Sequence, residues 1–458
     1  MVVFLKRISF FIALLCMLPA ASCYAQSATI SPYSRYGIGD IAGQNGVQSF
    51  SMGGTGIALH NDSLSPYFIN LKNPASYVFN KVTTYEAGLL NNNIQLTSEG
   101  QSHFNNNTYF GYFAIAFPIG NTLGASFGMR PMSNVGYNIN TTGNIDSNGT
   151  SIGTTNNQYI GTGGINQLHV GLAYSPKFFK NVAFGANVSY LFGYLNYTEN
   201  VIYSPNLLAF NSQKIENVNI HGFSTDYGIM YTIGRLGKKH DSLWQVVFGA
   251  TASMGSNLFA NYNLLSLSYV PAAPQNNIDT VQDSSAGGRI KIPMSFGGGI
   301  TIIKRDKNNN NQWMFSFDLA WQNWSQYSFL GQNGSLSNSK QMNIGFQYIP
   351  RKNYYDNKNG KVQAFFSRIH YRWGFSVNQT YLDLNNTLVK DYCASFGVGI
   401  PIGAPYAPPM NTQLGILNIG VQLGQLGDVT NDLLRERYAK VLVAFTFNSR
   451  WFQKRLYN

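Results

Sequence analysis

Hydrophobic and polar residues alternate without interruption from Arg368 to Asn378 in the stretch Arg368–Thr380. One parity carries apolar side chains, and the other carries charged, polar or small ones, including His370 and Arg372. Because successive side chains of a β-strand point to opposite faces, this stretch predicts a strand with one apolar and one polar face. The apolar face would form the core of a soluble sandwich, or it would face lipid in a membrane barrel whose polar face lines a lumen.

The same alternation recurs along most of the chain. We count 14 such segments between Lys81 and Asn448, and most exceed the usual five or six residues of a soluble strand. An even number lets both ends of a closed antiparallel barrel lie on one side of the membrane. The pattern predicts an all-β fold, a 14-stranded antiparallel transmembrane β-barrel over residues 81–448. The segments lie near 81–97, 104–119, 121–138, 164–176, 179–203, 221–234, 242–264, 289–304, 311–329, 337–349, 363–382, 387–402, 411–425 and 435–448.

Three long connectors favour the membrane alternative. The stretches at 139–163, 204–220 and 265–288 are rich in Asn, Gly, Ser and Thr, and each follows an odd-numbered segment. Several connectors after even-numbered segments are short. Membrane barrels have long outer loops and short periplasmic turns. We therefore expect these three stretches to be outer loops, with Leu265–Val270 as the best apolar candidate for ligand capture.

The N-terminus predicts export. Two basic residues precede the apolar run Ile8–Ala21, and residues 23–25 offer a small-residue cleavage site, so residues 1–25 are predicted to be a signal peptide. Lipid attachment at Cys23 is the alternative processing.

The charge balance is basic without indicating nucleic-acid binding. Lys and Arg number 31 against 19 Asp and Glu, but charged residues make up only 11% of the chain and aromatic residues 14%. Soluble domains average about a quarter charged residues. Together with export, this composition suits strands that face outer-membrane lipid, so we expect no nucleic-acid partner. A basic periplasmic tail is predicted at residues 449–458.

The segment at residues 26–80 does not alternate, and it predicts a small N-terminal plug. It contains a Gly-rich stretch at Ser51–Ala58 and an Asn-Pro-Ala motif at 73–75 before the first strand. In this order the motifs resemble the plug of the FadL-like (OMPP1/FadL/TodX) family of outer-membrane transporters. The opening at Ser31–Asp40 resembles family members from Bacteroidetes.

The resemblance implies a monomeric channel for passive uptake of hydrophobic or amphipathic small molecules. In that family the plug and a gap in the wall guide the ligand from the cell surface to a lateral exit. The residues that the resemblance assigns to the plug and channel are Gly53, Gly54, Gly56, Asn73, Pro74 and Ala75.

Parity places eight titratable side chains toward the lumen. An Arg that faces lipid at the bilayer centre costs roughly 2–4 kcal/mol, which excludes the opposite parity for the run at 368–372. Both signs of charge occur, so we expect a salt-bridge network that holds the plug to the wall rather than direct ligand contacts. The eight residues are Arg130, Asp226, Asp318, Arg368, His370, Arg372, Asp391 and Lys440.

No catalytic or metal site can be assembled from the sequence. Residues 149–153 match the G-x-S-x-G pattern without the strand and helix that a nucleophile elbow needs. The histidines lack metal-ligand spacing, and Cys393 has no partner after signal cleavage. We predict no enzyme, no metal and no cofactor. The alternative to a channel is a non-transporting barrel subunit of a Bacteroidetes secretion or assembly complex, as PorV is, with protein partners instead of a ligand.

Overall fold

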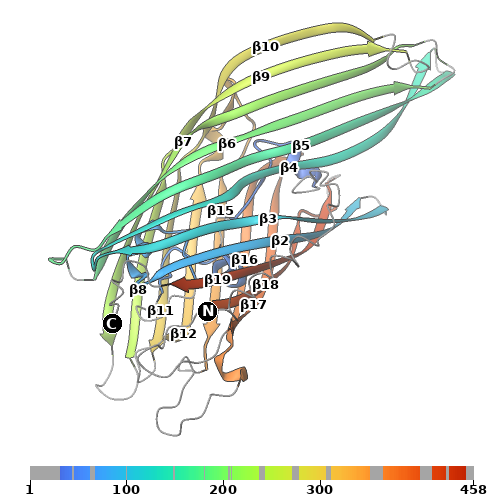
Figure 1. Ribbon diagram of the computed structural model, residues 1–458. Coiled ribbons are helices and arrows are strands. Elements are labelled where there is room, and N and C mark those ends of the chain that lie inside the picture. Colours follow the sequence, from blue (N-terminus) through green and yellow to red (C-terminus); the bar gives the residue numbers. More distant parts are fainter. Residues whose placement is uncertain are drawn as a thin grey trace, which may run out of the picture.

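The alternating segments pair in sequence order, and the last strand returns to the first. The computed structural model is a closed barrel of 14 long antiparallel strands (Figure 1), so the predicted fold class is confirmed. Strand β19 closes the barrel against β2, from Arg435 opposite Thr97 to Ser449 opposite Thr83. The uninterrupted strands are β2 (Thr83–Ser98), β3 (Gln101–Ile119), β4 (Leu123–Ser147), β5 (Thr150–Tyr174), β6 (Val182–Tyr203), β7 (Asn211–Leu236), β12 (Asn311–Gln322), β15 (Ser339–Tyr348), β16 (His370–Leu384), β17 (Thr387–Ile402), β18 (Gly415–Leu426) and β19 (Arg435–Ser449).

The two remaining strands are each interrupted at the same height. One consists of β8 (Leu243–Ser253) and β9 (Ser256–Tyr269), and the other of β10 (Ile278–Ile292) and β11 (Ser295–Arg305). Pro293 lies in the second break, and proline cannot donate a hydrogen bond to a strand ladder.

The other elements are short. No helix among the described residues is long and apolar enough to cross a membrane. These elements are η1 (Pro32–Arg35), β1 (Asp40–Ile41), α2 (Val47–Ser51), η2 (Pro74–Phe79), η3 (Trp324–Gln326), β13 (Ser328–Phe329), β14 (Gln332–Asn333) and η4 (Phe365–Arg368).

The structure describes most of the chain from residue 31 to residue 449. The predicted signal peptide, Cys23 and residues 450–458 of the predicted tail lie outside the described residues. The described residues are 31–449 except for 44–45, 62–67, 99–100, 148–149, 180, 205–206, 208, 237–242, 271–277, 306–310, 351–364, 403–414 and 430–432.

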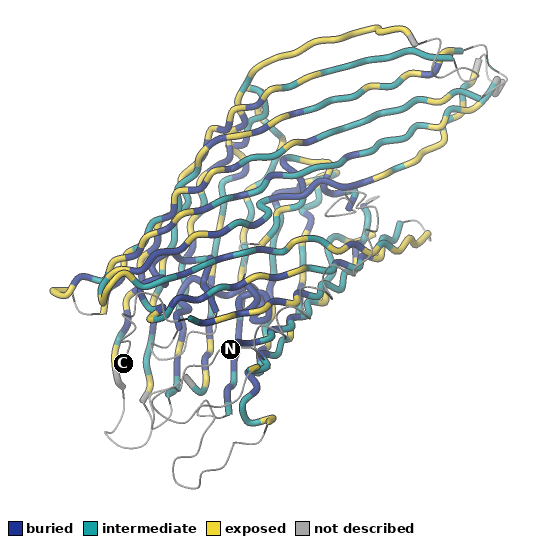
Figure 2. Tube along the Cα trace, viewed as in Figure 1, coloured by how far each residue is buried: buried dark blue, intermediate teal, exposed yellow. Residues whose placement is uncertain are grey.

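The alternating stretch at 368–380 forms a barrel strand from His370 onward. In β16, Trp373 and Phe375 are 40% and 45% exposed on the outer face, whereas His370 and Arg372 are buried inside. Figure 2 shows the same succession of buried and exposed positions along the other strands. One boundary differs from the prediction. Arg368 lies in η4, because a 3-10 turn precedes β16, so this residue is not on the strand wall.

Strands β4, β5, β6, β7, β9 and β10 continue beyond the other strands as one inclined sheet, which we call the projecting sheet (Figure 1). The prediction of three long outer loops is wrong here. Strands β4 and β5 stay paired as far as Ser147 and Thr150, β7 already begins at Asn211, and β9 continues to Tyr269.

Polar residues form strands in this sheet because their backbone groups pair with neighbouring strands and their side-chain amides bond to one another across the strands. On its outer face, the Gln158 amide donates to Asn138 at 3.3 Å, Asn200 donates to Gln158 at 3.1 Å, and Gln213 donates to Asn200 at 2.9 Å. Such amide pairs across strands replace the apolar contacts that strand propensity usually reflects.

The described residues between 31 and 80, called the N-terminal segment below, lie inside the barrel and contribute to its four buried apolar clusters. The burial of these side chains against the wall replaces the hydrophobic core of a soluble domain. The segment's contributions to the four clusters are Tyr33 and Ile38, Met52 and Leu59, Val47 and Phe50, and Tyr77 and Val78, respectively.

Candidate functional site

A belt of wall glycines surrounds the N-terminal segment. At each of them, an added β-carbon would collide with the segment or with the side chain that binds it. Glycine is the residue that permits such close approach of two backbones. The belt therefore records where the segment touches the wall. Its members come from ten elements, β4 to β8, β11 and β15 to β18, and are Gly124, Gly171, Gly185, Gly228, Gly249, Gly297, Gly299, Gly345, Gly374, Gly397 and Gly420.

The closest approach joins Gly374 on β16 to Gly53 in the segment. A β-carbon on Gly374 would lie 2.6 Å from the Gly53 Cα, and one on Gly53 would lie 2.6 Å from the Phe375 backbone N. Gly53 also has a positive φ of 67°, a conformation that glycine adopts without strain. Both contact residues must therefore be glycine, and Gly53 is one of the predicted plug residues.

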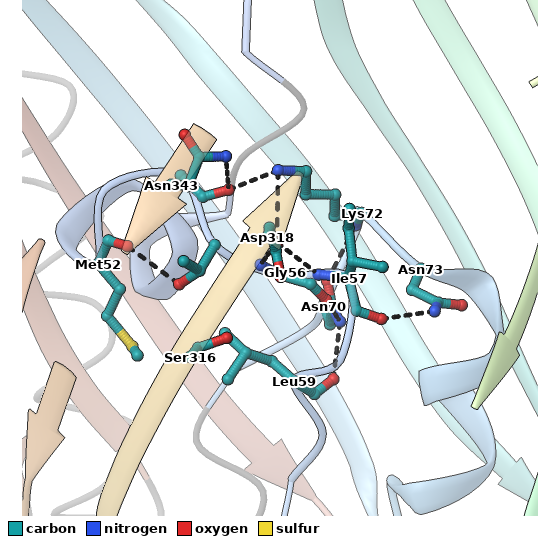
Figure 3. Close-up of polar contacts among 12 residues, drawn as sticks. Met52, Gly56, Ile57, Leu59, Asn70, Lys72, Asn73, Ser316, Asp318 and Asn343 are labelled. Atoms are coloured by element: carbon teal, nitrogen blue, oxygen red, sulfur yellow. Dashed lines mark hydrogen bonds and ion pairs between the residues drawn. The ribbon is translucent and has the colours of Figure 1, made fainter. Parts of the chain in front are cut away.

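Asp318 on β12 clamps the segment at its glycine-rich turn (Figure 3). The backbone N–H groups of Gly56 and Ile57 donate to its Oδ2 at 2.7 and 2.9 Å. The Lys72 Nζ lies 3.7 Å from the same oxygen and donates to the Gly54 carbonyl at 2.6 Å. Asp318 is fully buried, so its charge is balanced by these groups rather than by water. Burial lowers the pKa of Lys72, and the negative charge of Asp318 opposes that shift.

Two asparagines fold the segment back onto this turn. The Asn70 amide donates to the carbonyls of Gly56 and Leu59 at 2.7 and 2.8 Å, and the Asn73 amide donates to Ile57 at 2.6 Å. Asn73 also caps η2, because its Oδ1 accepts from the Ala75 N–H at 3.0 Å. Pro74 fits the first position of η2, where no N–H is needed.

Further bonds attach the other end of the segment to the wall. The Gly53 N–H donates to Ser395 on β17 at 2.6 Å, and Gln422 on β18 donates to the Phe50 carbonyl at 2.9 Å. Glu86 on β2 accepts from the Ile69 N–H at 2.9 Å and from the Tyr112 hydroxyl. Attachments from several strands around the wall hold the segment in place.

The wall is split between β3 and β4, and the segment covers the split. These strands pair only from Phe113 opposite Met129 to Ile119 opposite Leu123. Beyond that point, residues 31–42 run along β4 in place of β3. Asp40 and Ile41 pair with Asn134 and Ser133, the Ser31 N–H donates to the Gly136 carbonyl at 2.8 Å, and the Ala42 N–H donates to Met132 at 2.9 Å.

A cavity of about 300 Å³ lies in the lumen between the segment and the barrel wall. Asp40, Asp391, Glu436 and Lys440 all line it. The Tyr438 hydroxyl donates to Asp391 at 2.8 Å, and the Lys440 Nζ lies 4.5 Å from the Tyr438 ring centroid. Burial raises the pKa of Asp40, and the charge of Lys440 opposes that shift. The cavity is thus lined by charged groups as well as by apolar side chains such as Trp321, Trp324 and Leu382.

The residues expected to face the lumen occupy different levels of it. Asp318 contacts the segment directly, whereas Arg372 donates to Gln347 and Asn418 on the wall at 3.0 and 2.8 Å. His370 is the first residue of β16 and is fully buried. Of the eight, Asp318 forms a salt bridge with Lys72 of the segment.

The other expected lumen residues are held by wall side chains or lie elsewhere. Arg130 donates to Gln167 at 2.9 Å, and Asp226 accepts from Ser253 at 2.6 Å. Arg368 stacks its guanidinium over Phe365, 5.9 Å from the ring centroid, within η4. The structure therefore gathers Asp318 with the predicted Gly54, Gly56 and Asn73, and leaves most of the other charges on the wall.

Sequence reasoning missed Lys72, Glu86 and the wall glycines as part of this site. The glycines were visible as a signal, since Gly185 and Gly397 occupy the polar parity of their segments. Glu86 lies on the polar parity of the first alternating segment and could have been found, whereas Lys72 carried no periodic pattern that would have identified it. Among the described residues, no group of three or more His, Cys, Asp or Glu side chains could hold a metal ion.

A family model described as BamG matches residues 4–458. The chain belongs to the BamG family. The motifs of the N-terminal segment therefore predicted the fold but not the sequence family, because the matching model is not that of FadL. No curated protein sequence matches this BamG-family chain.

Solved structures similar to this chain include two toluene transporters and a FadL homologue. The Ralstonia pickettii toluene transporter TbuX is 15% identical, with a TM-score of 0.53 over 89% of this chain and 99% of its own. A Pseudomonas aeruginosa FadL homologue is 13% identical, with a TM-score of 0.53 over 89% and 99%. The Pseudomonas putida toluene transporter TodX is 14% identical, with a TM-score of 0.52 over 90% and 100%. At these identities the likeness establishes a FadL-like outer-membrane barrel fold.

Proposed function

We propose that this chain is a non-transporting barrel subunit of an outer-membrane complex, in which the N-terminal segment is a fixed plug. The observation that carries the proposal is the attachment of the segment at Asp318, where two backbone amides and Lys72 meet one buried carboxylate. The glycine belt supports it, because a segment that moved aside would also lose its close contacts with the wall at these glycines.

The cost of moving the segment argues against passive uptake. A solute that passes the segment would separate Asp318 from Lys72 in a buried site, and breaking a buried pair costs about 3–5 kcal/mol. Each lost hydrogen bond adds about 0.5–1.5 kcal/mol. A ligand can shift such an equilibrium only by its difference in affinity for the two states. A small hydrocarbon has few contacts with which to supply that difference.

The charges in the lumen and the covered split in the wall also argue against passive uptake. Four carboxylates line the cavity, from Asp40, Asp226, Asp391 and Glu436, and an apolar ligand would displace their solvent without offering hydrogen bonds. At the split, β1 lies along β4, so the chain's own backbone covers the place where a lateral exit would open. Both features favour a closed barrel.

The projecting sheet supplies a surface suited to protein partners. Along the edge that faces away from β9, β10 pairs with β13 only at Ile290 and Lys291. Much of that edge therefore has no strand neighbour among the described residues. An open edge can add a strand from a partner through backbone hydrogen bonds.

A channel for hydrophobic or amphipathic small molecules is the second candidate. It is favoured by the FadL-like fold and by the cavity, whose volume of about 300 Å³ reaches the lower end of the range for ligand sites, roughly 300–1,000 Å³. On this reading the segment would have to release the wall at Asp318 during transport.

Mild extraction from the native membrane distinguishes the two candidates. The purified protein is analysed by mass spectrometry for bound small molecules and for co-purified proteins. We expect a protein partner in constant ratio and no hydrophobic compound. A bound hydrophobic compound without any stoichiometric partner would overturn the proposal and support the channel.

A flux measurement in vesicles adds a second arm. Uptake of toluene by vesicles that contain the wild-type protein should equal that of empty vesicles. The channel candidate instead predicts uptake above that background, raised further by Asp318→Ala, which loosens the segment. Asp383→Ala, at an exposed position near the end of β16, is the matched control.

A further inference from the structure

A shallow groove of about 360 Å³ lies on the outer wall of the barrel, outside the site described above. It is apolar except for one charged side chain. The groove lies at the end of the barrel where β2 begins and β19 ends, because Lys304 is the penultimate residue of β11. The lining residues are Trp244, Ile302, Lys304, Trp313, Phe315 and Phe346.

Lys304 stands between two tryptophans in the register of the sheet. It is opposite Trp244 on β8 and opposite Trp313 on β12. The Lys304 Nζ lies 5.6 Å from the Trp244 ring centroid. Neither of the two salt bridges among the described residues involves Lys304. A cation at the outer wall that has no carboxylate partner in the described part of the chain is suited to an anion that comes from the membrane itself.

The neighbouring layer of the groove is purely apolar. Two positions along β11, Ile302 is opposite Phe315, which is in turn opposite Phe346 on β15. With a rise of about 3.3 Å per residue, this layer lies roughly 7 Å from Lys304 along the strand. The groove therefore presents a cation at the barrel end and a hydrocarbon surface toward the middle of the apolar band.

We propose that this groove binds one glycerophospholipid. Its phosphate would contact the Lys304 ammonium between Trp244 and Trp313, and one acyl chain would lie on Phe315 and Phe346. Charge complementarity selects this occupant. An apolar protein surface would leave the lysine unpaired, whereas a phospholipid satisfies the cation and the apolar layer with one molecule in the same order along the wall.

The test is native mass spectrometry of the folded, detergent-purified protein titrated with dioleoylphosphatidylglycerol. Dioleoylglycerol, which has the same acyl chains and no phosphate, is titrated in parallel. The variants are Lys304→Gln, Lys304→Arg and Phe315→Ala. The matched control is Lys291→Gln, an exposed lysine on β10 in the projecting sheet. The retained shift of the unheated band on gels verifies that each variant is folded.

We expect one phospholipid to remain bound to the wild-type protein and to Lys291→Gln. Lys304→Gln should weaken that binding about fivefold, which corresponds to about 1 kcal/mol per lysine at a membrane surface. Lys304→Arg should retain the lipid, Phe315→Ala should reduce it, and dioleoylglycerol should bind weakly to every form. Equal lipid occupancy in Lys304→Gln and the wild type would overturn the proposal. So would equal binding of the two lipids, or an equal loss in Lys291→Gln, because each indicates unspecific lipid around the barrel.

Discussion

Replacing Gly374 by Ala tests how closely the wall and the N-terminal segment fit. A β-carbon on residue 374 would lie 2.6 Å from the Gly53 Cα, and nearer still to the Gly53 N and the Met52 carbonyl carbon. Since ordinary contact begins at 3.4 Å, the two backbones would have to separate by about 0.8 Å or more. Backbone atoms cannot swing aside as the end of a flexible side chain can, so the whole turn would shift.

The magnitude follows from that shift. Overpacking of a well-packed interior costs about 1–3 kcal/mol. The movement would also lengthen the bonds that Gly56 and Ile57 donate to Asp318, three and four residues further along the segment. We therefore expect the free energy of unfolding to fall by about 2–3 kcal/mol in Gly374→Ala.

Gly298→Ala is the matched control, because nothing lies within 4 Å of a β-carbon at that position of β11. Alanine is favoured over glycine in a strand by roughly 0.5–1 kcal/mol, so this variant should lose no stability. The assay is guanidinium unfolding of protein folded into phosphatidylcholine vesicles, followed by tryptophan fluorescence. Equal midpoints for the two variants would refute the conclusion that the wall and the segment touch at Gly374.

Further substitutions test the Asp318 clamp, the Asn73 cap of η2 and the pairing of β1 with β4. Asp318→Ala removes the buried carboxylate and should lower the free energy of unfolding by about 3–5 kcal/mol in the same assay, while Asp383→Ala should leave it unchanged. Asn73→Ala removes the cap of η2, for which we expect a loss of about 1–2 kcal/mol; an unchanged midpoint would contradict this. Gly39→Ala adds a β-carbon 2.5 Å from a β4 carbonyl at a φ of 98°, so it should detach β1 and speed tryptic cleavage after Arg35. A cleavage rate equal to that of the wild type would contradict the pairing of β1 with β4.

The barrel could be predicted from the sequence because its determinant is local. Lipid and lumen impose opposite chemistry on alternate residues, and this pattern persists whatever the strands pair with. The projecting sheet could not be predicted in the same way. Its strands at 139–163 and 265–288 lie outside the apolar band, so no alternation marks them, and their Asn, Ser and Gly residues are typical of loops. Pairing with long neighbours decides their conformation.

Only part of the candidate site could be predicted from the sequence. Asp318 could be placed in the lumen by parity, and the Gly-rich turn and Asn73 by resemblance. Lys72 could not be matched to Asp318, because the path of an irregular segment through a barrel is set by packing rather than by period. The start of β16 at His370 rather than Arg368 shows the usual uncertainty of an element boundary, here caused by a 3-10 turn.

Hydrogen exchange at the amides of Gly56 and Ile57 tests the central claim, that the N-terminal segment is a fixed part of the barrel, most directly. Both amides donate to Asp318, so they exchange only when the clamp opens. In the full-length protein reconstituted into lipid nanodiscs, we predict that they stay protected as long as the backbone amides of β12. Exchange of these two amides within minutes, while β12 remains protected, would show that the segment leaves the wall and would contradict the account.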